Sequence, residues 1–142
     1  MKKSNSSERI KSFEEACLSL GLDPTQLPVV ANLPEKDQQS IIAFYKLTII
    51  TRALNEGWEP NWADFSERKY FNYLYIGGAA YFGSICGLSA STADSGFSVA
   101  YSSIGARLCF KSRELAEYAY SQFKELYWQY VLIDVPEGLV IK

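Results

Sequence analysis

The sequence contains no histidine among its 142 residues. Because imidazole is the commonest general base at neutral pH, its absence excludes Ser-His-Asp and Cys-His catalysis and every metal site with a histidine ligand. The chain also lacks a Walker motif, a Rossmann fingerprint, an EF-hand loop and a nucleophile elbow. We therefore predict a protein that is not an enzyme and that has no cofactor or metal site.

Pairs of carboxylates are the acid–base groups that remain. Asp64 and Glu67 fall in a polar loop, and Glu114 and Glu117 fall on the exposed face of a predicted helix. Neither pair is flanked by the apolar residues that would raise a carboxyl pKa for catalysis. We interpret these acids as surface groups.

Cysteine and long apolar runs are scarce too. Cys17, Cys86 and Cys109 are far apart and odd in number, which is typical of buried thiols in a reducing compartment and not of a disulfide frame or a zinc site. The N-terminal "MKKSNSSERIKS" lacks the apolar stretch of a signal peptide. No window approaches the roughly 20 apolar residues of a membrane span. These features predict a soluble, intracellular protein with no membrane partner.

The composition fits one ordinary domain with many aromatic rings. Apolar residues make up 48% of the chain, which is enough for a core, and aromatic residues make up 15%. The formal net charge of −2 argues against a protein that coats nucleic acid by bulk charge. We predict a disordered tail over residues 1–7 and a single domain over residues 8–142.

Three segments carry helical patterns. Ser12 and Glu15 form a capping box at the start of a short first helix. A second helix over about 35–56 contains "IIAFYKLTIITRAL", which is apolar on nearly every side and therefore predicts burial on more than one face. Ser112 is the predicted cap of a last helix over about 113–133.

The segment between the last two helices has the character of strands. Asp94 is the only charged residue from Tyr70 to Ala106, and Tyr, Phe, Ile, Val, Ser and Gly dominate there. Strands are predicted over about 69–76, 79–86, 97–101 and 106–110, with turns at the glycines and at Asp94-Ser95-Gly96. The C-terminal "LVIK" is either a short tail or an edge strand.

The predicted fold class is α+β. A small antiparallel β-meander of about four strands packs against two long helices, with a short N-terminal helix. The outer face of the sheet is either a Ser- and Tyr-rich solvent face or an uncharged face that packs on a second copy or holds a ligand. Because no Lys or Glu protects the strand edges from pairing, we expect a homo-oligomer.

Two places could bind a ligand. Arg107, Lys111 and Arg113 gather with no acid among them at the entrance to the last helix, where free N–H groups and Ser112 could help to hold an anion. Ordinary helix capping with solvated cations is the alternative. In "WEPNW", Trp58 and Trp62 either close the end of the core or present a ring for stacking.

Three stretches resemble a known group of proteins. They are "LPEKDQQSIIAFYKLTIITRALNEGWEPNW", "KYFNYLYI" and "GARLCFKSRELAEYAYSQFKELYWQYVLI". From about 33 to 133 the chain resembles a group of short uncharacterised proteins of Bacteroidales phages and prophages. The resemblance implies a phage-encoded protein that acts in the cytoplasm of an infected bacterial host or in the virion, and it assigns no role to any residue.

Three hypotheses for function follow. The first is a non-catalytic protein that binds a small anionic, nucleotide-like signal of host defence, with phosphate held by Arg107, Lys111 and Ser112. The rings predicted to stack on its base are Tyr70, Tyr73, Tyr75, Tyr81, Phe97 and Tyr101. The second is a virion structural or assembly protein that uses the uncharged sheet as an interface. The third, single-strand nucleic-acid binding, is opposed by the acidic net charge and the lack of cations in the sheet.

Overall fold

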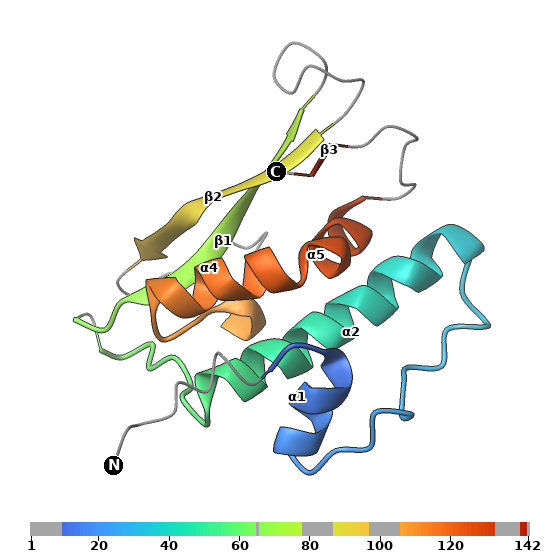
Figure 1. Ribbon diagram of the computed structural model, residues 1–142, viewed down its shortest axis with the longest axis horizontal. Coiled ribbons are helices and arrows are strands. Elements are labelled where there is room, and N and C mark those ends of the chain that lie inside the picture. The colour runs from blue at the N-terminus through green and yellow to red at the C-terminus, as the bar shows by residue number, and fades with distance from the viewer. Residues whose placement is uncertain (1–9, 65, 78–86, 97–105, 133–139, 142) are drawn as a thin grey trace.

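In the computed structural model, helices α4 and α5 lie between a small group of strands and the long helix α2 (Figure 1). The structure describes residues 10–64, 66–77, 87–96, 106–132 and 140–141. The elements are α1 (Phe13–Ser19), α2 (Glu35–Asn55), β1 (Lys69–Gly77), β2 (Gly87–Gly96), the 3₁₀ helix η2 (Ala106–Leu108), α4 (Arg113–Gln122), α5 (Lys124–Val131) and β3 (Val140–Ile141).

Local sequence signals mark the start of α1 and the end of α2. The side chain of Ser12 accepts a hydrogen bond from the N–H of Glu15 at 3.2 Å, which confirms the predicted cap. Helix α2 ends at a left-handed turn made by Glu56 (φ 49°) and Gly57 (φ 83°). That turn directs the chain away from the helix and into the tryptophan-containing loop.

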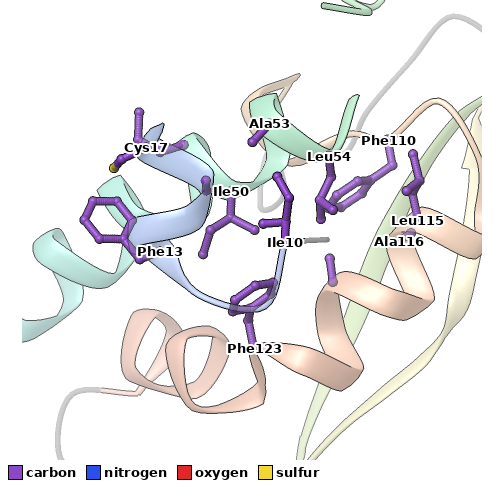
Figure 2. Packing of buried hydrophobic residues seen from close by; sticks show 13 residues of the cluster. Ile10, Phe13, Cys17, Ile50, Ala53, Leu54, Phe110, Leu115, Ala116 and Phe123 are labelled. Carbon is purple, nitrogen blue, oxygen red and sulfur yellow. The ribbon is translucent and has the colours of Figure 1, made fainter. Parts of the chain in front are cut away.

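The main core joins α1, α2, α4 and the segment that precedes α4. Figure 2 shows Phe13 and Cys17 of α1 with Ile50 of α2, and Phe110 beside Leu115. The buried members of this cluster are Ile10, Phe13, Ala16, Cys17, Ile49, Ile50, Ala53, Leu54, Phe110, Leu115, Ala116, Ala119 and Phe123. Cys17 and Cys109 are both buried, as predicted, and Cys86 lies outside the described residues.

The strands pair in the order β1-β2-β3. Strand β1 runs antiparallel to β2, from Lys69 opposite Gly96 to Gly77 opposite Gly87, and the two-residue β3 runs parallel to β2. On the other edge of β1, Tyr70 and Phe110 exchange two backbone hydrogen bonds of 3.1 and 2.7 Å. This single bridge links β1 to the segment that leads into α4.

The predicted fold class is wrong. The described residues are mainly helical, and they do not contain the predicted antiparallel meander of about four strands. Residues 106–108 form a 3₁₀ turn where a strand was predicted, and Asp94-Ser95-Gly96 belongs to β2 where a turn was predicted. The predicted strands over 79–86 and 97–101, like the predicted disordered tail over 1–7, lie outside the described residues.

A side chain of α2 occupies the outer edge of the segment that leads into α4. The amide of Asn55 donates to the carbonyl of Cys109 at 2.8 Å and accepts from the N–H of Lys111 at 3.1 Å. These bonds take backbone groups on the edge of the segment that faces away from β1, so no further strand pairs there, and toward β1 the pairing is limited to the Tyr70–Phe110 bridge.

The last helix is also shorter than predicted. It is divided into α4 and α5 at Phe123, whose backbone leaves the helical region (φ −119°, ψ 31°). Phe123 is buried in the main core, and after the break α5 packs along α2, where Ser40 donates to the carbonyl of Tyr130 at 2.8 Å. Packing of both halves against α2 therefore overrides the continuous helical pattern of the sequence.

Candidate ligand groove

An open hollow of about 380 Å³ lies where α2 ends, and we call it the Trp groove. It is lined by Thr48, Thr51, Arg52, Asn55, Trp58, Glu59, Pro60, Trp62, Arg107 and Cys109. The lining comes from three parts of the chain: the C-terminal half of α2, the loop that follows it, and the segment around η2. Helical spacing explains the first part, because positions 48, 51, 52 and 55 share one face of α2.

Asn55 joins the two halves of the groove. Its side chain is buried, and its bonds to Cys109 and Lys111 fix the segment around η2 against the end of α2. The carbonyl of Asn55 also accepts the N–H of Trp58 at 3.0 Å. The same residue therefore sets the position of Cys109 on one wall and the start of the tryptophan loop on the other.

Glu67 organises the loop that carries both tryptophans. Its carboxylate accepts the indole N–H of Trp58 at 3.3 Å and the backbone N–H of Asn61 at 2.8 Å. It also pairs with the ammonium of Lys69 at 3.1 Å. The Asn61 hydrogen bond and the Lys69 ammonium hold the pKa of Glu67 below its usual value. The carboxylate is therefore ionised at neutral pH and fixes the loop.

Two guanidinium groups and two indoles face the same hollow. Arg52 and Arg107 are both exposed, and within the described residues neither forms an ion pair. Trp62 is 40% exposed, so part of its ring is accessible to a ligand. Guanidinium groups bind phosphate or carboxylate with paired hydrogen bonds, and indole rings stack on flat aromatic groups. The groove can therefore hold an anion and an aromatic ring together.

The lining of the groove includes one thiol, that of Cys109, and this thiol is unreactive. Cys109 is buried, and this burial raises the pKa of its thiol to about 11. A thiol with that pKa is protonated at neutral pH and is a poor nucleophile. Within the described residues, no group of three or more Cys, Asp or Glu side chains is placed to hold a metal ion.

The strand-to-helix junction looks different from the predicted anion site. Lys111 pairs with Glu56 at 3.0 Å, and Ser112 accepts the N–H of Leu115 at 3.3 Å as the cap of α4. The guanidinium of Arg113 lies 5.9 Å from the centre of the Tyr70 ring. Each of these three side chains has a partner within the fold, while Arg107 lines the Trp groove.

The aromatic candidates are divided between the groove and other places. Trp58 and Trp62 line the groove, and Tyr70 packs against the main core beneath Arg113. Tyr73 and Tyr75 belong to β1, but the structure does not describe their side chains. Three further candidates lie outside the described residues: Tyr81, Phe97 and Tyr101.

Sequence reasoning missed Arg52 and Lys69. Arg52 is the one basic residue in the last turn of α2, close before Trp58, and that proximity was a usable signal. Lys69 gave no signal, because nothing in the sequence distinguishes a buried lysine at the start of a strand from an exposed one.

Comparison with protein-family models, with curated proteins and with solved structures finds no match. Among the described residues, no helix is both long enough and apolar enough to cross a membrane. The function of the groove is therefore inferred from the residues that line it.

Proposed function

We propose that this chain is a non-catalytic binding protein that holds a small anionic ligand with an aromatic ring in the Trp groove. A nucleotide is the simplest ligand of that class. One observation carries the proposal: Arg52 and Arg107, which are separated along the chain, line the same hollow as Trp58 and Trp62.

The groove suits such a ligand in size and in charge. Its volume of about 380 Å³ falls within the range of small-molecule sites, near the lower end. Two guanidinium groups favour a phosphate, and Glu59 at the rim is an acceptor for an amino or hydroxyl group. The accessible part of the Trp62 ring offers a surface on which a base can stack.

A second hollow, between α2 and α5, is a useful contrast. It has about 310 Å³ and is lined by Glu35, Gln38, Gln39, Ile42, Lys46, Leu126 and Gln129. That lining contains one cation and no aromatic ring, so it lacks the pairing of positive charge with indole on which the proposal depends.

The resemblance to phage proteins suggests a biological setting for this binding. In that setting the chain is encoded by a phage and removes a nucleotide-like signal of host defence from the cytoplasm of the infected cell, as a homo-oligomer. Sequestration requires high affinity for the ligand but no chemical step. A binding site without a histidine or a reactive thiol is therefore sufficient.

A second candidate is a virion structural or assembly protein. In that role Leu18, which is 70% exposed, and Val29, which is 86% exposed, would be covered where another protein binds beside them. Mass spectrometry of purified virions separates the two candidates. Many copies per particle would support the structural role, and absence from particles would reject it.

A melting-temperature screen with AMP, ADP, cyclic dinucleotides and inorganic pyrophosphate tests the proposal. A ligand present at 100 times its Kd stabilises the folded state by about 2.7 kcal/mol, which corresponds to roughly 9 °C for a chain of this size. Arg52→Ala and Arg107→Ala should each reduce the shift, and the double variant should abolish it.

Lys124→Ala is the matched control for these variants. Lys124 is a cation on α5 that lies over the Tyr120 ring and does not line the groove. The shift should persist in this variant. If no nucleotide changes the melting temperature of the folded protein, or if the double arginine variant keeps the full shift, the proposal is wrong.

A further inference from the structure

Lys69 is a fully buried cation beside the groove. Its side chain is 0% exposed, although lysine is rarely buried completely in proteins. Its ammonium donates to the carbonyl of Asp64 at 3.3 Å and to the carbonyl of Glu67 at 3.1 Å, and it pairs with the Glu67 carboxylate at 3.1 Å. It also lies 5.4 Å from the centre of the Trp62 ring.

All of these contacts are made with one short segment, which we call the Trp loop: residues 58–64 and 66–67. Lys69 reaches Trp62 directly, and it reaches Trp58 and Asn61 through the Glu67 carboxylate. One ammonium therefore restrains the loop at both tryptophans and at the turn between them.

We propose that Lys69 is the positioning residue of the Trp groove. Its ammonium fixes the Trp loop, and so it sets the places of Trp58 and Trp62 before any ligand arrives. The ordering of the loop is independent of the proposed function, whereas its consequence for ligand affinity rests on that function.

The physical argument starts from the cost of burying a charge. An ammonium removed from water is stable when other groups replace its hydration, and the Trp loop supplies two carbonyls, a carboxylate and a ring face. Lys69 begins β1, whose backbone is held by pairing with β2. The loop, which is otherwise irregular and largely exposed, is therefore restrained by a group on a paired strand.

Such restraint matters for binding because an ordered site loses less conformational entropy when a ligand enters. Tryptophan rings that are already in place can stack on a base without first being ordered. Loss of Lys69 should therefore weaken binding even though Lys69 itself does not line the groove.

Tryptophan fluorescence tests the role of Lys69 without a ligand. In a Trp128→Phe background, all indole emission comes from Trp58 and Trp62. Lys69→Met keeps an unbranched side chain that is one atom shorter and removes its charge. Well below the melting temperature, we expect the acrylamide quenching constant to rise roughly twofold, because the loop opens locally while the rest stays folded.

A control separates loop order from global stability. Phe123→Leu weakens the main core at the α4–α5 break, away from the groove, and should lower the melting temperature without changing the quenching of the loop tryptophans. If Lys69→Met protein is folded and shows the same quenching as the parent, the proposal is overturned.

Glu67→Gln is the second variant, and it decides the matter if Lys69→Met does not fold. Glutamine removes the charge that pairs with Lys69 but keeps an acceptor oxygen for the Trp loop, and the Lys69 ammonium retains its two backbone carbonyls. Increased quenching in this variant supports the proposal, and unchanged quenching overturns the link from Lys69 through Glu67. If quenching rises in Lys69→Met but the parent protein binds neither ADP nor any other nucleotide, this inference stands. Only the proposed function is then rejected.

Discussion

Replacement of Asn55 by leucine should destabilise the protein strongly, because the buried Asn55 side chain joins α2 to the segment around η2. Leucine has nearly the shape of asparagine, so the packing volume is kept while both hydrogen bonds are lost. The carbonyl of Cys109 and the N–H of Lys111 then lose the partner that lies 2.8 and 3.1 Å away.

The magnitude follows from the burial of this site. Asn55 is 4% exposed and Cys109 is 1% exposed, so water replaces the lost partner poorly. Loss of a hydrogen bond by a buried polar group costs about 1–3 kcal/mol, which applies to the Cys109 carbonyl, and the half-buried N–H of Lys111 adds less. Because a domain has a total stability of about 5–15 kcal/mol, this is a large fraction.

Urea denaturation followed by circular dichroism measures the loss. Gln122→Leu is the matched control, because it removes an exposed amide that donates to the carbonyl of Lys11 at 3.1 Å. That change should cost less than about 0.5 kcal/mol, as is usual for surface substitutions. If Asn55→Leu costs no more than Gln122→Leu, the described role of Asn55 in joining α2 to the η2 segment is wrong.

Three further expectations can be tested together. Trp128→Phe should leave the free energy of unfolding unchanged or raise it by up to about 1 kcal/mol. The reason is that, within the described residues, the buried indole N–H of Trp128 has no hydrogen-bond partner. A large loss of stability in urea would contradict this. Cys109, with a thiol pKa of about 11, should react with a disulfide reagent at pH 8 far more slowly in the folded protein than in urea, and equal rates would refute its burial. Glu67 has a folded pKa below its unfolded value, so its stabilising contribution is complete above the unfolded pKa of about 4.3 and is lost as the pH falls through the lower folded pKa. The emission of Trp58 should therefore change in that acid range in the parent but not in Glu67→Gln, and identical pH profiles would contradict the Glu67 bond.

The helices were predictable because their signals are local. A capping serine before α1 and the apolar run of α2 act over a few residues, and the structure confirms both helices. The break at Phe123 was not predictable in this way. It depends on how both halves of the helix meet α2, and that information is spread over the whole fold.

Strand β2 was missed for a related reason. Its sequence, "GLSASTADSG", is rich in small and turn-forming residues and has few that favour strands. It is extended because β1 pairs with it along most of its length. Pairing between distant segments thus decided a structure that local composition opposed.

The groove was half visible in the sequence. Trp58, Trp62 and Arg107 were all selected as candidates, but in separate groups, because spacing along the chain does not reveal that η2 returns to the end of α2. The link between them is the buried amide of Asn55. A single asparagine at a helix end gives no sign in the sequence of which distant backbone it will bind.

The most direct test of the central claim is a fluorescence titration of the Trp128→Phe protein with ADP, adenosine and pyrophosphate. If guanidinium groups and indoles act together in the Trp groove, ADP should quench the emission saturably and bind at least about tenfold more tightly than either fragment, a difference of roughly 1.4 kcal/mol. The Arg52→Ala/Arg107→Ala protein should lose this preference. Equal affinity for ADP and adenosine, or no saturable quenching by ADP in folded protein, would contradict the account.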